Sequence, residues 1–441
     1  MEKYSVQGGQ QLQGSVAVSG AKNVALKALV AACLTDEEVI IKNIPLISDF
    51  MIMVDIMRDL GGDVQIQDHE VRIKVREFAH SSIPLDKAAH ARTSAMFLAP
   101  LLARTGEAVI PNPGGCRLGA RPIDRLVDGV EKMSVVISYK SEDGYFHAKT
   151  DGLQAIDYSF AKNTHTGTET LILAAVLAKG TTLLKNAAEE PEIDDLITLL
   201  TLMGANVKRS SHREITIVGV EKLHGTTFTI SPDRNEIVTF AIAALVTKGD
   251  VTIKDAEKVD LSAFLEKVTE AGGGYEKTKD GIHFFYKGPL KAVDVTTVIY
   301  PGFMTDWQAP WAVLMTQAEG TSVVHETVFE NKLGYVKDLT KMGAKVKLFN
   351  PEVEDRETTY NFNLTDDSPD FFHAVKITGP TPLHNAIVTM LDIRAGAAVV
   401  LAALAAKGET IIHGVYLVDR GYEKFEERLS SIGAHIERND E

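Results

Sequence analysis

The stretch AKGTTLLKN at residues 178–186 joins a Gly turn to a short strand, and the chain carries six versions of it. In each version an apolar helical run precedes the turn, and a second helical run follows the strand. The turns centre on Glu37, Gly106, Gly180, Gly249, Gly320 and Gly408, at intervals of 69, 74, 69, 71 and 88 residues. The sequence therefore predicts a structural unit of about 70 residues, repeated six times.

A closing signal of the Gly-Ala-x-Val type ends the second helix of five units. It appears as LGGDV, MGANV, AGGGY, MGAKV and IGAHI, around Gly61, Gly204, Gly272, Gly343 and Gly433. The second unit has no such glycine near Met133. Six units of this size exceed one ordinary core, so we expect two domains of three units each.

The first helix of every unit is apolar on all sides and the second is amphipathic. Helices that are apolar all round belong in an interior, so the first helices should be buried, with the sheets around them. The buried runs are ALKALVAACL (25–34), SAMFLAPLLA (94–103), TLILAAVLA (170–178), IVTFAIAALV (237–246), WAVLMTQA (311–318) and AAVVLAALAA (397–406).

The predicted domain boundaries follow the segment HGTTFTISPDRNE at 224–236, where a strand pattern meets a Ser-Pro-Asp turn. We expect one domain over residues 21–229 and a second, discontinuous domain over residues 1–20 plus 230–441. Residues 350–374 lengthen the last interval. They are acidic and partly strand-patterned, which predicts an inserted hairpin or flap.

Composition excludes several classes of function. The 441 residues carry a formal charge of −14, which argues against a nucleic-acid or anionic-membrane surface. There are two cysteines, Cys33 and Cys116, and no disulfide framework, no signal-peptide core and no apolar stretch of membrane-spanning length. We expect a cytoplasmic enzyme whose Cys33 is buried and inert.

Familiar nucleotide and metal motifs do not occur. The sequence has neither a GxxxxGK[ST] loop nor a GxGxxG after a strand, and His90, His165 and His373 lack metal-ligand spacing. Phosphate-loop hydrolysis, dinucleotide redox chemistry and zinc catalysis are therefore disfavoured. No cofactor is expected.

Unusual residues recur where the units join. Lys22, in GAKN before the first buried helix, suits an anion, although a solvated lysine is the plain alternative. Cys116 lies among glycines and arginines in PNPGGCRLGARPID (111–124), and neighbouring cations lower a thiol pKa. Cys116 is therefore a candidate acid or nucleophile.

Three further junctions carry aspartates. Asp306, in YPGFMTDWQAP (300–310), precedes a buried helix, where an N-cap or a first-turn carboxylate is the structural alternative. Asp392 lies two residues before Arg394, and Asp419 directly precedes Arg420, so each pair is a possible structural ion pair. With Lys22, Arg92 and Arg121, these arginines would form a cationic cluster for a small, doubly anionic substrate.

At these residues the chain resembles the enolpyruvyl transferases, and the resemblance extends over nearly its whole length. The matching segments are SGAKNVALKAL (19–29), PGGCRLGARPID (113–124), AKGTTLLKNAAEEPEI (178–193), YPGFMTDWQA (300–309), ETVFENKLGYV (326–336), DIRAGAAVVLAALA (392–405) and DRGYEKFEERLSSIGAHIER (419–438). The resemblance implies a two-domain inside-out α/β barrel with six βαβαββ repeats, three per domain, closing over substrate at their interface.

The resemblance also implies an activity: transfer of the enolpyruvyl group from phosphoenolpyruvate to the sugar 3-hydroxyl of UDP-N-acetylglucosamine, with release of phosphate and without a metal, as the first committed step of peptidoglycan synthesis. Lys22, Arg121 and Arg420 would hold phosphoenolpyruvate, with Arg92 and Arg394 extending the cationic site. Asn23 would contact the sugar. The remaining nucleotide contacts implied are Pro122, Ile123, Asp124, Arg125, Lys162, Thr164, His165, Val328 and Lys332.

The chemistry needs an acid and a base on opposite sides of the reacting double bond. In this reading Cys116 protonates the methylene carbon, Asp306 takes the proton of the attacking hydroxyl, and the cations stabilise the departing phosphate.

Three departures from the family pattern lie on the acceptor side. Thr164-His165-Thr166-Gly167-Thr168 replaces the usual Ser-Val-Gly-Ala-Thr, Lys332 replaces an arginine, and Leu126 replaces a histidine. Two alternatives stay open: a paralogue that acts on another uridine nucleotide, and an inactive homologue that serves as a binding protein. An enzyme for shikimate 3-phosphate is disfavoured by the Cys loop and the RPID turn.

Overall fold

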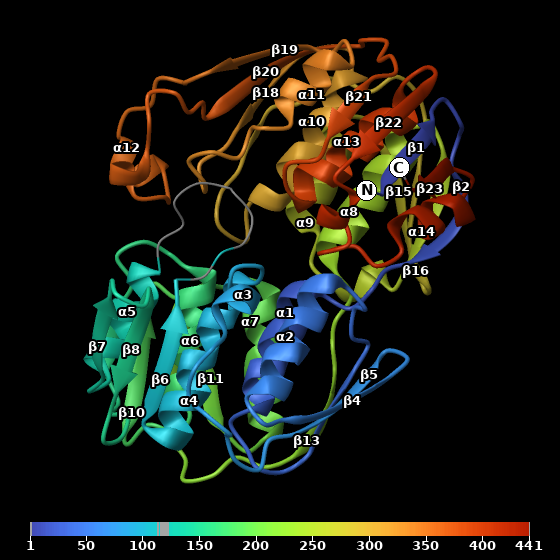
Figure 1. Ribbon diagram of the computed structural model, residues 1–441. Helices are drawn as coiled ribbons and strands as arrows, with labels where there is room; N and C mark the ends of the chain where they lie inside the picture. Colours follow the sequence, from blue (N-terminus) through green and yellow to red (C-terminus); the bar gives the residue numbers. More distant parts are fainter. Residues whose placement is uncertain (1, 113, 115–122, 441) are drawn as a thin grey trace. The chain divides into compact units, whose positions relative to one another are not determined.

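The computed structural model describes residues 2–112, 114 and 123–440. These residues form two compact units. The N-terminal unit contains residues 20–112, 114 and 123–231, and the C-terminal unit contains residues 2–19 and 232–440. In Figure 1 the former runs from blue to green, and the latter from yellow-green to red, with the blue N-terminal strands.

The interior of each unit is made of helices, as the apolar runs predict. In the N-terminal unit these are α1 (Lys22–Ala32), α4 (Leu98–Thr105) and α6 (His165–Ala175). In the C-terminal unit they are α8 (Arg234–Val246), α10 (Gln308–Thr316) and α13 (Ile393–Ala405). Every residue of α8 and α10 is buried, because a helix that is apolar all round has no face to offer to water.

The middle inner helix of each unit begins as a 3₁₀ turn, which the apolar pattern does not predict. Segment η1 (Arg92–Phe97) leads into α4, and η3 (Thr305–Trp307) leads into α10. Pro100 and Pro310 then each lie in the first turn of the α-helix. Proline lacks an N–H and is tolerated only there, so it sets where the α-helix begins.

Amphipathic helices lie outside the inner ones. They are α2 (Ser48–Asp59), α5 (Asp124–Lys132), α7 (Pro191–Leu202), α9 (Ser262–Glu270), α11 (Val336–Lys341) and α14 (Phe425–Ser431). A short helix, α3 (Leu85–Ala88), precedes η1. In the C-terminal unit, η2 (Ala256–Lys258) follows β14 and η5 (Val415–Leu417) follows β22.

The described residues form six small sheets, one for each repeat. In the N-terminal unit, the strand order of the first sheet is β13 (Thr226–Thr229), β3 (Val39–Lys42), β5 (Glu70–Lys74), β4 (Asp63–Gln67). The order of the second is β6 (Glu107–Pro111), β8 (Tyr145–Lys149), β7 (Val136–Lys140). The order of the third is β11 (Asn206–Ser211), β12 (Glu214–Val218), β10 (Thr181–Lys185), β9 (Asp157–Ser159).

In the C-terminal unit, the strand order of the first sheet is β15 (Gly274–Thr278), β16 (Gly281–Phe285), β14 (Asp250–Lys254), β2 (Gln13–Ala17). The order of the second is β17 (Val295–Thr296), β18 (Gly320–His325), β20 (Ala374–Gly379), β19 (Lys345–Phe349). The order of the third is β21 (Ile387–Thr389), β22 (Glu409–His413), β1 (Lys3–Gln7), β23 (His435–Asn439).

The sheets confirm the βαβαββ order of the repeats. In the chain order β9, α6, β10, α7, β11, β12, strands β9 and β10 are parallel, and the other two pairings are antiparallel. The N-terminal strands complete sheets far along the chain, because β1 pairs with β22 and β23, and β2 pairs in parallel with β14.

The second repeat keeps its closing turn without its glycine. Gly61, Gly204, Gly343 and Gly433 have φ values of 98°, 99°, 89° and 100°. Ser134 occupies the equivalent position after Met133 with φ 66°. The left-handed backbone is therefore retained, at the cost of a side chain in a region that favours glycine.

We predict that Ser134→Gly stabilises the protein by about 1 kcal/mol, because it relieves the cost of a Cβ in the left-handed region. Urea unfolding measures the change. The matched substitution Gly204→Ser, at φ 99°, should destabilise by a similar amount or more. A loss of stability in Ser134→Gly would show that the serine side chain has a structural role of its own.

The insertion at 350–374 differs from its prediction. It connects β19 to β20, but the part between these strands contains the short helices α12 (Arg356–Thr359) and η4 (Leu364–Asp366) and no strand. Tyr360 stacks against His325 and His373, with ring centroids 5.7 and 4.9 Å away. The insertion therefore packs through aromatic rings onto the end of β18.

In the described parts of the chain, no helix has the length and apolar character needed to cross a membrane.

Candidate active site

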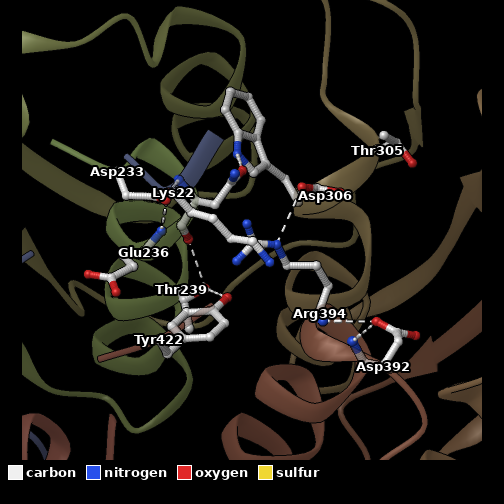
Figure 2. Close-up of polar contacts among 12 residues, drawn as sticks. Lys22, Asp233, Glu236, Thr239, Thr305, Asp306, Asp392, Arg394 and Tyr422 are labelled. Atoms are coloured by element: carbon white, nitrogen blue, oxygen red, sulfur yellow. Dashed lines mark hydrogen bonds and ion pairs between the residues drawn. The ribbon is translucent and has the colours of Figure 1, made fainter. Parts of the chain in front are cut away.

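The N-terminal ends of the three inner helices of the C-terminal unit meet. Trp307, which ends η3 before α10, donates from Nε1 to the side-chain oxygen of Asn235 in α8 at 3.1 Å. Arg394, at the start of α13, places Nε 3.3 Å from a carboxylate oxygen of Asp306. Figure 2 shows the contact between Arg394 and Asp306. Helix N-termini carry partial positive charge, so this junction favours anions.

Asp306 lies between two cations. Its carboxylate accepts from Lys332 Nζ at 2.7 Å and from Arg394 Nε at 3.3 Å. Burial acts to raise the pKa of Asp306, but Lys332 and Arg394 outweigh it and hold that pKa well below its usual range. Neither η3 nor α10 has a side-chain cap, so Asp306 is not an N-cap, but its alternative position as a first-turn carboxylate of η3 is confirmed.

Asp392 and Arg394 do not form the ion pair that their sequence spacing suggests. Asp392 caps α13 instead, since its Oδ1 accepts from the backbone N–H groups of Arg394 and Ala395 at 2.9 and 3.0 Å. The Arg394 guanidinium lies over the Tyr422 ring, 5.2 Å from its centroid. Nη1 of Arg394 is buried, and no described residue accepts a hydrogen bond from it, so this donor is suited to an anionic ligand.

A buried glutamate that sequence reasoning missed organises this region. Glu326 is 1% exposed and accepts from Thr305 Oγ1 at 2.8 Å. Its other oxygen accepts from the backbone N–H groups of Val328 and Phe329 at 2.8 and 3.1 Å. Lys332 donates to Thr305 at 2.9 Å as well as to Asp306. One network therefore positions Val328, Lys332 and Asp306.

Asp419 also has a different partner from its sequence neighbour. Its carboxylate binds both terminal nitrogens of Arg438, in β23, at 3.0 and 2.5 Å. Arg438 also contacts Glu426 at 2.8 Å. These contacts tie the turn that contains Arg420, which follows η5, to the sheet. The pairing of Asp419 with Arg420 is therefore wrong.

Lys22 is buried at the start of α1. It is 9% exposed, and its Nζ lies 2.7 Å from a carboxylate oxygen of Asp49 in α2. The solvated-lysine alternative is wrong. Asp49, which is 5% exposed, was not identified from the sequence because it lies one helix away, in the unremarkable segment LISDF.

The other predicted residues of the N-terminal unit lie at helix starts. Asn23 is the second residue of α1, Arg92 opens η1, and Ile123 precedes α5, which begins at Asp124. Arg125 donates from Nη1 to the carbonyl of Asn163 at 3.2 Å. Lys162 is half-buried ahead of α6. Thr164 caps α6, accepting from Gly167 N at 3.2 Å, and His165 is the first residue of that helix.

Cys116, Arg121 and Pro122 lie outside the described residues, so their roles stay predictions. Leu126 is 3% exposed and belongs to the core of the N-terminal unit. Cys33 is fully buried, as predicted, and burial raises the pKa of its thiol to about 12. In the described part of the chain, no cluster of three or more His, Cys, Asp or Glu side chains is arranged to hold a metal ion.

Known proteins are similar in sequence to this chain over nearly its whole length. The family described as EPSP synthase (3-phosphoshikimate 1-carboxyvinyltransferase) matches residues 6–429. A UDP-N-acetylglucosamine 1-carboxyvinyltransferase of Acidobacterium capsulatum is 42% identical over 99% of this chain and 96% of the relative. A protein of the same name from Koribacter versatilis is 41% identical over the same shares.

Solved structures support the fold. The enolpyruvyl transferase NikO from Streptomyces tendae has a TM-score of 0.87 at 22% identity, covering 99% of both chains. EPSP synthase from Acinetobacter baumannii has a TM-score of 0.74 at 19% identity over the full length of both. With the family match and the relatives at about 40% identity, these results show that the chain belongs to the EPSP synthase family of enolpyruvyl transferases.

Proposed function

We propose that this chain transfers the enolpyruvyl group of phosphoenolpyruvate to the sugar 3-hydroxyl of UDP-N-acetylglucosamine and releases phosphate, as in the first step committed to peptidoglycan. The name carried by the relatives at about 40% identity supports this acceptor. The observation that carries the chemistry is the carboxylate of Asp306 held between Lys332 and Arg394.

This arrangement provides a base beside cations. In the addition step the acceptor oxygen bonds to C2 of phosphoenolpyruvate, its proton passes to Asp306, and C3 gains a proton from an acid, for which Cys116 is the candidate. In the elimination step C3 returns a proton to the conjugate base of that acid, the C2–C3 double bond forms again, and the C2–O bond to phosphate breaks to release inorganic phosphate. Arg394, with a buried guanidinium nitrogen directed to no described acceptor, is suited to stabilise the phosphate in both steps.

The low pKa of Asp306 bears on its role as a base. While Lys332 and Arg394 both contact the carboxylate, its affinity for a proton is weak. An anionic substrate that draws these cations toward its own oxygens weakens their hold on Asp306 and raises its pKa. Binding of phosphoenolpyruvate would thus make the base effective only when the donor is present.

Among the helix starts of the N-terminal unit, Lys22 of α1, Arg92 of η1 and Arg125 of α5 are positive, which agrees with an anionic substrate on an acidic chain. We assign Asn23, Ile123, Asp124, Lys162, Thr164, His165 and Val328 to the nucleotide acceptor, and Arg420 and Arg121 to phosphoenolpyruvate.

Phosphate release tests this proposal. The protein is incubated with phosphoenolpyruvate and, separately, with UDP-N-acetylglucosamine, UDP-N-acetylgalactosamine, UDP-glucose or shikimate 3-phosphate. We expect release with UDP-N-acetylglucosamine above all. A preference for another uridine nucleotide would establish the second candidate, which the altered segment around His165 favours. The absence of release with every acceptor would favour a binding protein.

Thiol labelling tests the role of Cys116. Because burial raises the pKa of Cys33 to about 12, an alkylating reagent at pH 8 should leave Cys33 unmodified in the folded protein and label Cys116. Peptide mass spectrometry identifies the site, and phosphoenolpyruvate should change the labelling rate. Equal labelling of both cysteines, or of neither, would remove Cys116 as the acid.

A further inference from the structure

The N-terminal unit contains a buried charge cluster that the chemistry above does not use. Glu169, in α6, is 0% exposed. Its Oε2 lies 3.3 Å from Nζ of Lys27 in α1, and its Oε1 lies 3.3 Å from Nε2 of His165, one turn earlier in α6. One carboxyl group therefore lies between the first residue of α6 and a lysine that is itself 5% exposed, at ion-pair distance from both, and neither of its oxygens completes a hydrogen bond with a described residue.

The environment of Glu169 raises the pKa of its carboxyl group above the ordinary range. Burial raises its pKa to about 8, Lys27 opposes that rise, and Glu192 and Glu190, at the start of α7, add to it. Two cationic side chains come from the other elements packed on α6. Arg92 opens η1, and Arg125 of α5 bonds to the carbonyl of Asn163, just ahead of α6.

The position of His165 connects this cluster to the acceptor. The histidine occupies the place of valine in the family motif quoted above, at the positive end of an 11-residue helix. Its side chain is one-quarter exposed, and Nε2 is the nitrogen directed at Glu169. A protonated imidazole at this end of α6, with Arg125 nearby, favours a diphosphate group.

We propose that Glu169, held by Lys27, is a positioning residue that orients His165 and supplies the proton that charges its imidazole when the diphosphate of the nucleotide acceptor binds. The inference rests on the proposed function. The proton leaves Oε1 of Glu169 and joins Nε2 of His165, so the pair keeps one proton, and no proton is taken from solution. The bound anion then faces an imidazolium whose charge is balanced by the Glu169 carboxylate.

The sign of the pH dependence follows from this transfer. Below about pH 8 Glu169 holds the proton that His165 needs. Above it the carboxyl is already ionised, so binding must take a proton from solution and the KM for the nucleotide rises. With Glu169→Gln this internal proton source is absent, so binding must take the proton from solution. The rise in KM should therefore begin at a lower pH than in wild type.

The experiment measures KM for UDP-N-acetylglucosamine and kcat from pH 5.5 to 9.5 at saturating phosphoenolpyruvate, for wild type, Glu169→Gln, His165→Val and the double variant. At pH 7.5 we expect Glu169→Gln to raise this KM about tenfold, with kcat and the KM for phosphoenolpyruvate within about twofold of wild type. His165→Val should raise it similarly and abolish the pH dependence. Adding Glu169→Gln to His165→Val should change nothing further.

Two controls keep the result specific. Asp195→Asn removes another carboxyl of this unit whose pKa burial raises, to about 6, and which accepts from Ser231 at 3.0 Å. It should leave the pH profile as in wild type. If Glu169→Gln folds poorly because Lys27 loses its counter-charge, Lys27→Met combined with Glu169→Gln removes both charges and should show the same early rise in KM.

The outcomes separate this inference from the proposed function. Calorimetric titration with uridine diphosphate reports binding without turnover, so an enzyme that releases no phosphate still shows whether the affinity depends on pH and on Glu169. Three results would overturn the role of Glu169. They are an equal effect of Glu169→Gln on KM with and without His165, a loss of kcat in proportion to the rise in KM, and binding of uridine diphosphate that does not depend on pH.

Discussion

Asp306→Asn should fold and bind the uridine nucleotide, yet turn over about 10²–10⁴ times more slowly than wild type, the range for removal of a general base. The amide keeps the shape of the carboxylate but cannot accept the acceptor's proton. Because Lys332 and Arg394 both contact Asp306, the change also removes their counter-charge, and we expect a loss of about 1–3 kcal/mol in unfolding free energy. Phosphate release and urea unfolding measure the two effects.

Asp392→Asn is the matched control. It changes the same residue type two positions before Arg394, where the oxygen caps α13, and asparagine caps a helix as well as aspartate does. Stability and turnover should stay near wild type. If Asp306→Asn keeps wild-type turnover in its folded fraction, Asp306 serves only to pair the two cations, and the base lies elsewhere.

The inner helices were predictable because a helical run that is apolar on every side has to be buried. Helices α1, α6, α8 and α13 lie where their runs predict. Helix α4 begins at Leu98, later than its run at 94–103 suggests, because Pro100 admits an α-helix only from its first turn. Helix α10 begins at Gln308, before its run at 311–318. The missing glycine near Met133 was evident in the sequence, but the left-handed backbone retained at Ser134 was not.

Side-chain partners were harder to predict than elements. Adjacent Asp and Arg residues suggested ion pairs, but an N-cap aspartate such as Asp392 directs its oxygens at backbone N–H groups, away from the next side chain. The actual partners come from other elements. Asp306 and Arg394 are 88 residues apart, and Lys27 of α1 meets Glu169 of α6 only because the fold of the N-terminal unit brings the two side chains together. Sequence spacing contains no signal for such contacts.

Lys22→Ala should lower turnover on the order of 100-fold, because in the proposed reaction it removes a charge that stabilises the phosphate of the donor. The structure adds a second expectation. Asp49 is 5% exposed and 2.7 Å from Lys22, so the single variant removes a cation from beside a buried carboxylate and should lose up to about 3–5 kcal/mol of stability. Loss of activity in this variant alone therefore has two explanations.

The double variant Lys22→Ala/Asp49→Asn distinguishes them. It removes both charges, so most of the lost stability should return, as measured by urea unfolding. Turnover should stay as low as in Lys22→Ala, because the positive charge for phosphoenolpyruvate is still missing, and the KM for phosphoenolpyruvate should stay raised. If turnover recovers together with stability, Lys22 acts only as the partner of Asp49. The cationic site for the donor must then be built from Arg394, Arg420 and the other arginines alone.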